Sequence, residues 1–264
     1  MSAVDAVAGG GAGATGGAGA GPNAVAPTRH RFQFARRCPG RPVAKMIWFD
    51  LSEAFCRTVL KLCYRFRITG ESRVPAHGPC IFVSNHQSYL DPVINGCAVV
   101  DRQLTAMAKE SLFAFKPFAW LMRSYGAISL KEDGGDLAAF RAALSELKAG
   151  RTVLIYPEGT RSPDGGVEPF LQGISLLVRR AGVPVVLLGI EGAHDVWPRG
   201  RRFPRMFGRI EVEVGETLLP ESLPRDDAAL RTLLRAKVME LVARRGAAMR
   251  RAGWRPRRSH KESP

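Results

Sequence analysis

The stretch CIFVSNHQSYLDP, residues 80–92, combines a short apolar run, a polar loop and the start of a helix. The apolar run is typical of a buried strand. Pro92 suits the first position of a helix, and Asp91 before it is predicted as the N-cap. A strand that leads through a loop into a helix is the repeating unit of α/β domains.

Outward from this stretch, short apolar runs keep alternating with helical patterns. Strands are predicted at residues 80–84, 104–108, 127–130, 152–156, 183–190 and 210–214. Helices are predicted from Pro92, over 112–125, from Asp136 to Gly150 and over 173–180. The 210–214 strand alternates apolar residues with glutamate, as an edge strand does. The pattern predicts one α/β domain over residues 68–220, with a mixed, mostly parallel sheet flanked by helices.

An amphipathic helix is predicted before this domain, over residues 45–67. Its apolar residues recur at steps of three and four from Ile47 to Phe66, and Arg57, Lys61 and Arg65 lie on another side. Such a helix either packs on the domain or lies at a membrane surface, and the residues alone leave both open. Residues 1–44 form an Ala/Gly-rich, then basic segment whose first 27 residues are predicted to be disordered.

The positive charge of the chain lies in its two flanks. The 264 residues include 39 Lys+Arg and 24 Asp+Glu, a net charge of +15. Residues 231–264 contain 11 basic and 2 acidic residues, and residues 28–45 contain 6 basic and no acidic ones, so the flanks hold the whole excess. This charge indicates partners that present phosphates. A neutral body with basic ends favours surface anchoring. Residues 221–264 are predicted to be a basic C-terminal helix, from Asp226 to about Arg245, and a disordered tail.

The cysteines give no metal or disulfide pattern. There are five of them without a CxxC pair, so reduced thiols are expected and no metal site is predicted. No stretch of about 18 uncharged apolar residues predicts a membrane-spanning helix. The N-terminus has no apolar core typical of a secretory signal.

The loop in residues 85–90 brings a candidate base close to a candidate carboxylate. Four residues separate His86 from Asp91, enough chain to fold the carboxylate back onto the imidazole. A carboxylate bonded to one ring nitrogen fixes the tautomer and makes the other nitrogen a better base for a hydroxyl proton. Taken alone, the same residues also fit a helix cap and an ordinary loop histidine.

A second motif, IYPEGTRS at residues 155–162, lies where a predicted strand ends. α/β folds bind ligands at this end of their strands. Gly159 allows close approach of the backbone, Thr160 and Ser162 offer hydroxyls, and Arg161 offers a planar fork for a phosphate. Taken alone, this motif also fits a surface turn with a solvated arginine.

Together the two motifs resemble those of the glycerolipid acyltransferase family, typified by bacterial 1-acylglycerol-3-phosphate acyltransferase. The shared pattern is Asn-His, four residues and Asp-Pro at 85–92, followed some 65 residues later by PEGTRS at 157–162. KESLF at 109–113 with YGAI at 125–128 looks like the middle motif of that family, and GVPVV at 182–186 resembles its fourth. The resemblance covers about residues 68–220.

The resemblance implies an acyl transfer without an acyl-enzyme. His86 would take the proton of the acceptor hydroxyl while Asp91 holds the imidazole, and the oxygen would attack an acyl thioester of coenzyme A or acyl carrier protein. The residues that would hold the acceptor phosphate are Glu158, Gly159, Thr160, Arg161 and Lys131. The reaction would make phosphatidic acid for phospholipid synthesis, with no metal and no resident cofactor.

Two positions depart from the family pattern. The family commonly has a phosphate-binding arginine at about Glu132, where only the neighbouring Lys131 offers a positive charge. Gln172 stands where a basic residue usually precedes glycine. Both departures weaken the assignment of 1-acylglycerol-3-phosphate as the acceptor, and His194 is interpreted as a structural or rim residue.

The expected partners are a lysophospholipid acceptor, an acyl thioester donor and an anionic membrane surface, which places the enzyme on a membrane at its cytoplasmic face. Alternative acceptors are another lysophospholipid, an aminolipid or a glycolipid. A basic nucleic-acid-binding protein is a second alternative, and a lipid-binding relative without activity is a third. The basic flanks lack interleaved aromatic residues, so no nucleic acid is expected.

Overall fold

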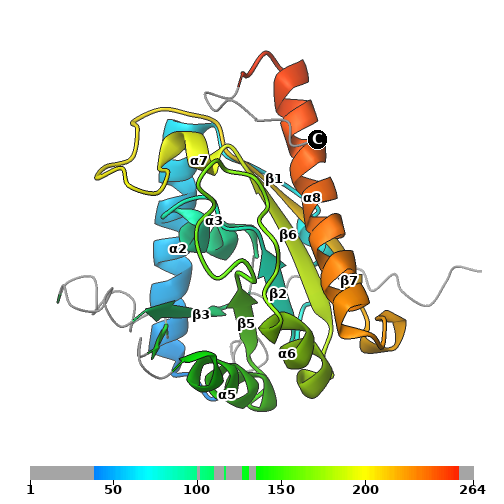
Figure 1. Ribbon diagram of the computed structural model, residues 1–264. Helices are drawn as coiled ribbons and strands as arrows, with labels where there is room; N and C mark the ends of the chain where they lie inside the picture. The colour runs from blue at the N-terminus through cyan, green and yellow to red at the C-terminus, as the bar shows by residue number, and fades with distance from the viewer. Residues whose placement is uncertain (1–38, 100–101, 110–115, 117–126, 131–134, 256–264) are drawn as a thin grey trace, which may run out of the picture.

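The structure is a computed structural model that describes residues 39–99, 102–109, 116, 127–130 and 135–255 (Figure 1). Predictions for the N-terminal 38 residues, the 112–125 helix, Lys131 and Glu132 therefore fall largely or wholly outside the described residues. A seven-stranded sheet forms the centre of the described part. Its strands are β1 (Arg67–Thr69), β2 (Ile81–Ser84), β3 (Leu104–Lys109), β4 (Ile128–Leu130), β5 (Thr152–Ile155), β6 (Val185–Glu191) and β7 (Glu211–Leu218).

The strand order is β1-β7-β6-β2-β5-β3-β4. Neighbouring strands pair parallel except β6 and β7, which pair antiparallel. The predicted mixed, mostly parallel sheet is therefore confirmed. The described helices of four residues or more are α2 (Val43–Tyr64), α3 (Asp91–Ala98), α5 (Gly135–Lys148), α6 (Gly173–Ala181), α7 (Ala193–Val196) and α8 (Asp227–Arg251).

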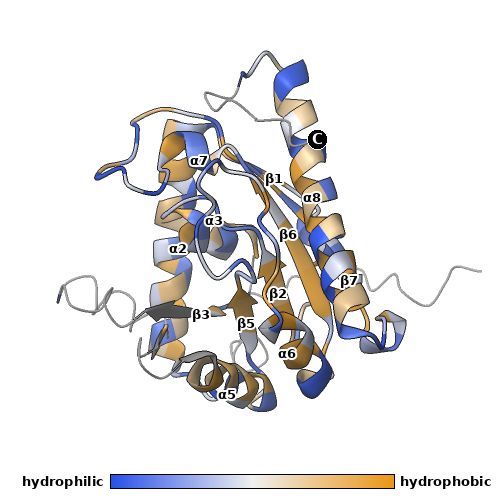
Figure 2. Cartoon of the chain, in the orientation of Figure 1, coloured by the Kyte–Doolittle hydropathy of each residue, from blue (hydrophilic) through white to orange (hydrophobic). Residues whose placement is uncertain are grey.

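Side chains of the central strands point alternately to the two faces of the sheet, as the period of two requires. On β2, Ile81 and Val83 pack in one cluster with residues of α5, α6 and α8. Phe82 belongs to a cluster on the other face, next to the one in which α2 and α3 pack. Figure 2 shows the apolar strands β2 and β6 between helices that mix apolar and polar residues. Both faces of the sheet are covered by helices, which explains the continuous apolar runs of β2 and β6.

Helix α8 belongs to the same packed unit as the sheet. It begins after the N-cap Asp226, whose Oδ2 accepts a hydrogen bond from the Ala229 N–H at 2.7 Å. Its buried residues Leu230, Leu234, Val238 and Leu241 join the core cluster of β2 and β6. The helix continues to Arg251, six residues beyond the end at about Arg245 that the sequence predicts.

The prediction of an edge strand at residues 210–214 is wrong. β7 lies between β6 and the short strand β1, which forms the edge. The alternating glutamates that suggested an exposed edge are buried, and arginines compensate their charge. Glu211 Oε1 lies 2.7 Å from Arg209 Nη2, and Glu213 Oε2 lies 2.7 Å from Arg245 Nε.

Helix α2 packs through a different face from the one that the sequence suggested. Met46, Phe49, Leu60 and Tyr64 are buried. The predicted apolar stripe faces outward from residue 47 to residue 62; its large exposed side chains are Ile47, Leu51, Phe55, Val59 and Leu62, joined by Val43 and Trp48. None of the helices in the described part of the chain has the length and hydropathy needed to span a bilayer. The helix thus packs on the domain and still presents an apolar face.

Candidate active site

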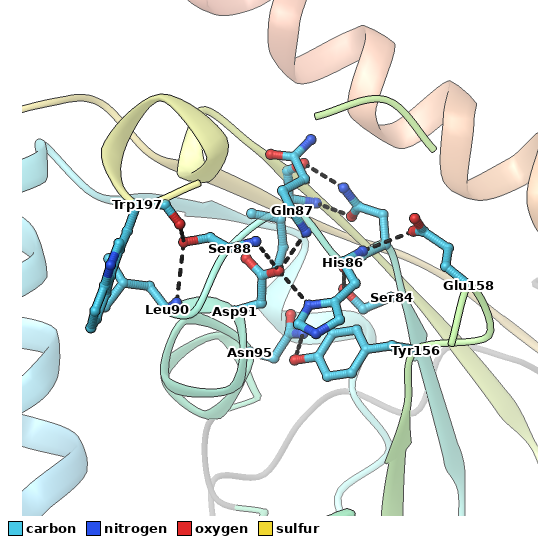
Figure 3. A network of polar contacts seen from close by, with 12 residues as sticks. Ser84, His86, Gln87, Ser88, Leu90, Asp91, Asn95, Tyr156, Glu158 and Trp197 are labelled. Carbon is cyan, nitrogen blue, oxygen red and sulfur yellow. Dashed lines mark hydrogen bonds and ion pairs between the residues drawn. The ribbon is translucent and has the colours of Figure 1, made fainter. Parts of the chain in front are cut away.

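The loop between β2 and α3 folds the Asp91 carboxylate back onto the His86 imidazole (Figure 3). Asp91 Oδ2 lies 2.8 Å from His86 Nδ1 and also accepts backbone hydrogen bonds from Gln87 N at 2.6 Å and Ser88 N at 2.7 Å. Because an ionised carboxylate oxygen can only accept hydrogen bonds, the His86 Nδ1 that faces it carries the hydrogen. Nε2 is then the nitrogen that can accept a proton from a hydroxyl.

Asp91 is the first residue of α3, and Leu90 is its N-cap. The predicted N-cap role of Asp91 is therefore wrong by one position. Its fully buried side chain bonds to the preceding loop, because two loop N–H groups point at it. Asp91 thus closes the loop around His86, as the four-residue spacing predicted.

Asn85 ties the base of this loop to the neighbouring strand. Its Nδ2 donates to the Ile190 carbonyl at 3.0 Å, and its Oδ1 accepts from the Ile190 N–H at 2.8 Å. The side chain thereby pairs with the end of β6 as another strand residue would. The residue before His86 therefore holds the loop in register with the sheet.

Tyr156 provides a wall for the imidazole. Its ring stacks on His86 with centroids 4.1 Å apart and an interplanar angle of 19°. The Tyr156 hydroxyl accepts a hydrogen bond from Asn95 Nδ2 at 3.1 Å. Burial raises the pKa of this hydroxyl well above its ordinary value, so it remains protonated. The imidazole is therefore held by a stacked ring as well as by a carboxylate.

The second motif is clamped to the same loop through the peptide groups of His86. The His86 N–H donates to Glu158 Oε1 at 2.8 Å, and the Ser162 N–H donates to the His86 carbonyl at 2.8 Å. Glu158 Oε2 also accepts from the Glu168 N–H at 3.2 Å. Burial raises the pKa of the Glu158 carboxyl to about 8, against these backbone hydrogen bonds, which lower it. Glu158, predicted to bind substrate, thus has both oxygens bonded to the backbone of the site.

Gly159 and Thr160 form the exposed part of the turn. Gly159 has φ +70°, and an added Cβ would lie 2.6 Å from Leu171 Cδ1. A side chain here would strain the backbone at this φ and would require Leu171 to shift. This leaves the backbone of the turn open at the surface, where a ligand can approach it.

Arg161 lies on the face of Tyr89, three residues after His86 in the loop. Its guanidinium carbon is 3.4 Å from the centroid of the Tyr89 ring. The Nη1 atom is buried and makes no protein hydrogen bond. The second motif therefore brings a cation, held by a cation–π contact, next to the His86 loop. Lys131, the other predicted phosphate ligand, lies outside the described residues.

His194 lies at the rim of this site. The contact of its Nε2 is with the Pro163 carbonyl at 3.1 Å, in the loop that follows the second motif. This contact agrees with its interpretation as a structural or rim residue.

The cysteine thiols in the described part of the chain are not among the groups that contact His86 or Asp91. The four cysteines of the described part, Cys56, Cys63, Cys80 and Cys97, are free. Burial raises the pKa of the Cys80 thiol to about 11 and that of Cys97 further, so both are protonated core residues. Within the described ranges no group of His, Cys, Asp and Glu side chains could hold a metal ion.

The sequence identified His86, Asp91 and the 157–162 turn, and the structure brings them together. It missed the bonding roles of Asn85, Tyr156 and Ser162, although all three lie within the quoted motifs. One feature of the sequence could have indicated these roles. Each of the three is a polar or aromatic residue that directly follows a buried strand or lies in the turn after it. Which partner each selects depends on strands that are far apart in the chain.

Comparison with known proteins gives the same family as the motifs. The family model Acyltransferase matches residues 65–191. A 1-acyl-sn-glycerol-3-phosphate acyltransferase of Pseudomonas aeruginosa is 30% identical over 185 residues, which cover 68% of this chain and 69% of that protein. A lyso-ornithine lipid O-acyltransferase of the same organism is 25% identical over 210 residues, covering 73% and 79%.

A chloroplastic 1-acyl-sn-glycerol-3-phosphate acyltransferase of Brassica napus is 31% identical over 152 residues, 56% of this chain. The chain spans only 44% of the length of that relative. Among solved structures, the 1-acyl-sn-glycerophosphate acyltransferase of Thermotoga maritima matches with a TM-score of 0.67 and 26% identity. This match covers 81% of the present chain and 83% of the other.

Proposed function

The chain belongs to the glycerolipid acyltransferase family, and on this basis we propose that it acylates 1-acylglycerol-3-phosphate to phosphatidic acid. The acyl donor is an acyl thioester of coenzyme A or acyl carrier protein. The observation that carries the proposal is the 2.8 Å contact between His86 Nδ1 and Asp91 Oδ2, within the segment that matches the family.

His86 acts as the general base. Its Nε2 takes the proton of the acceptor hydroxyl as the oxygen attacks the thioester carbonyl. The new C–O bond forms, the C–S bond breaks, and the thiolate leaves with the proton that the imidazolium returns. Asp91 stabilises the imidazolium and keeps Nδ1 protonated throughout. Each step uses protein acid–base chemistry, so the proposal includes no metal and no resident cofactor.

The 158–161 turn and Lys131 bind the acceptor phosphate. Support comes from the Arg161 guanidinium, which keeps one buried nitrogen without a protein acceptor. A planar guanidinium and the open backbone at Gly159 suit phosphate oxygens. Glu158 contributes through the His86 N–H that it holds, as a positioning residue.

A second acceptor class is an aminolipid. Glu132 stands where the family commonly has a phosphate-binding arginine. In addition, one of the relatives, similar over 210 residues, is a lyso-ornithine lipid O-acyltransferase. The His86 and Asp91 chemistry is the same for both acceptors, so the acceptor assay has to separate them.

The protein acts at the membrane surface on the cytoplasmic face. The apolar face of α2 supports the membrane contact: Phe55 is 70% exposed and Leu62 76% exposed, while Met46, Phe49, Leu60 and Tyr64 pack on the domain. Large exposed apolar areas mark interaction surfaces, and both substrates of the proposed reaction carry acyl chains. The expected contact is peripheral, through α2 lying in the bilayer interface.

The test is an acyl-transfer assay with purified protein and labelled acyl-coenzyme A. Lyso-phosphatidic acid, lysophosphatidylcholine and lyso-ornithine lipid serve as acceptors, and thin-layer chromatography separates the products. Labelled phosphatidic acid as the main product is expected. Labelled ornithine lipid instead would replace the proposed acceptor, and no labelled lipid from any acceptor would reject the proposed function.

A further inference from the structure

The connection between α7 and β7 carries a second cluster of exposed apolar side chains. Phe203 is 66% exposed, Met206 76% and Phe207 72%. The cluster lies within the segment WPRGRRFPRMFGR at 197–209, which contains five arginines and no acidic residue. We refer to residues 198–208 as the Arg/Phe loop.

The Arg/Phe loop is ordered by hydrogen bonds within it and to the two residues before it. The Arg205 N–H donates to the Val196 carbonyl at 3.0 Å, and Arg201 Nε donates to the Phe203 carbonyl at 2.9 Å. Trp197 Nε1 donates to the Arg201 carbonyl at 2.8 Å. None of these contacts involves the three apolar side chains, which stay exposed. The loop therefore presents its apolar residues in a defined conformation.

The loop begins at the candidate active site. Ser88 Oγ, two residues after His86, donates to the Trp197 carbonyl at 2.8 Å. The Trp197 ring lies 5.1 Å from that of Tyr89, the ring on which Arg161 lies. Any surface that binds the Arg/Phe loop would therefore lie next to the His86 loop.

The loop ends at the C-terminal end of α2. The Gly208 N–H donates to the Cys63 carbonyl at 3.2 Å, next to the exposed Leu62. Figure 1 shows the loop leaving α7 next to the end of α2. The end of the loop thus lies beside the end of α2 that carries the exposed Leu62.

We propose that the Arg/Phe loop is a second membrane-contact element, which inserts Phe203, Met206 and Phe207 into an anionic lipid surface. Arg199 and Arg202 are both exposed, and the Arg202 guanidinium lies over the Phe203 ring, 5.3 Å from its centroid. These cations complement the negative headgroups. Aromatic and aliphatic side chains with flanking arginines are the composition that interfacial segments use. Charge complementarity and the contact with α2 favour a lipid surface over a second protein. The loop then holds the bilayer beside the active site, a consequence that rests on the proposed function.

The test compares the wild type with F203Q/M206Q/F207Q in vesicle co-sedimentation. Phosphatidylcholine vesicles with and without phosphatidylglycerol are the probes. We expect the variant to lose at least about tenfold in affinity for the anionic vesicles, because three large apolar side chains no longer enter the bilayer. R199Q/R202Q should weaken binding to anionic vesicles only.

The matched control is L137Q/L176Q/M239Q, which changes three exposed apolar residues on α5, α6 and α8. It should bind vesicles as the wild type does, and all variants should keep the melting temperature of the wild type. Equal binding by the loop variant and the wild type would overturn the proposal. A wild-type dimer that the loop substitutions convert to a monomer in light scattering would also overturn it, since the cluster would then join two copies.

Activity measurements separate this inference from the proposed function. The loop variant should lose turnover on long-chain lyso-phosphatidic acid in vesicles but keep it on a short-chain, monomeric acceptor. An equal loss on both acceptors would place the loop in catalysis and contradict a membrane role. If the wild type acylates neither acceptor, the proposed function fails, and the vesicle comparison still decides whether the loop binds lipid.

Discussion

At the scale of single residues, His86 is held through its imidazole ring, its backbone N–H and its backbone carbonyl. Asp91 and Tyr156 position the imidazole, while Glu158 and Ser162 bind the backbone N–H and carbonyl. The two motifs are thus one hydrogen-bonded unit, although more than 60 residues separate them in the chain. A change in either motif should therefore alter the position of the imidazole.

The first prediction concerns proton transfer. H86A should lower kcat about 10²–10⁴-fold, the usual contribution of a general base. D91N should do nearly as much: its amide oxygen can still accept the loop N–H groups, but the negative charge beside the imidazolium is lost. Steady-state acyl transfer measures the effect, and circular dichroism checks the fold. Wild-type turnover in folded H86A would remove His86 from the mechanism, and wild-type turnover in folded D91N would remove Asp91 as its partner.

The second prediction concerns the acceptor phosphate. R161K keeps the charge but loses the planar fork, so the acceptor KM should rise about tenfold and the donor KM should change little. Y89F keeps the aromatic face under the guanidinium and serves as the control. Equal increases in both KM values would mean that Arg161 has a structural role or binds the donor.

The third prediction concerns Glu158 and pH. Its pKa is raised from 4.5 to about 8 in the folded protein by burial, so the folded state retains a proton that the unfolded state releases. The contribution of Glu158 to the free energy of unfolding should therefore fall as the pH rises from about 4.5 to about 8. Thermal melts of the wild type and E158Q across this range measure it. The advantage of the wild type over E158Q should shrink with rising pH, and a constant difference would contradict the raised pKa.

At the scale of helices and strands, periodicity predicted six of the seven strands to within a few residues. β1 was missed because Arg67–Thr69 is too short to show a period. The edge assignment of β7 failed because its glutamates are buried against arginines of α8, far along the chain. Periodicity identifies the apolar stripe of α2 but not what covers it, so the sequence leaves open whether this stripe packs on the domain.

Part of the active site could also be predicted from the sequence. The spacing of His86 and Asp91 was enough to predict their contact, because only a short loop separates them. The sequence could not show that Glu158 would bond to the His86 backbone, since that contact depends on β2 and β5 lying side by side in register. Local chain geometry is readable from the sequence, whereas contacts between strands require the sheet.

The fourth prediction concerns the ion pairs between α8 and β7. Arg244 and Arg245 both bind Glu213, whose side chain is only 6% exposed. R244Q/R245Q should lower the free energy of unfolding by about 3 kcal/mol, because a buried carboxylate loses two cations. Urea unfolding measures this, with R250Q/R251Q at the exposed end of α8 as the control. Adding E213Q to the double variant should recover part of the loss, and no recovery would point to helix packing instead.

At the scale of the whole molecule, the basic C-terminal region is partly committed to the fold. Arg244 and Arg245 bind carboxylates of the sheet, and Arg235 donates to the carbonyls of Val167 and Glu168. These cations cannot bind headgroups without giving up their partners. The predicted contribution of the C-terminal flank to membrane anchoring is thereby reduced, and the apolar face of α2 becomes the main candidate.

The last prediction concerns how salt acts on membrane binding. The wild type should bind anionic vesicles, and high salt should weaken this binding without abolishing it, because screening removes headgroup attraction but leaves apolar insertion of α2. L51Q/F55Q/L62Q changes three exposed side chains of α2 and leaves its buried face intact. At high salt this variant should retain less binding than the wild type, because only the apolar side chains of the Arg/Phe loop can still enter the bilayer. Co-sedimentation at low and high salt compares the variant with the wild type. Complete release of the wild type by salt would mean that α2 does not insert, and binding indifferent to lipid charge would exclude arginines and lysines from the contact.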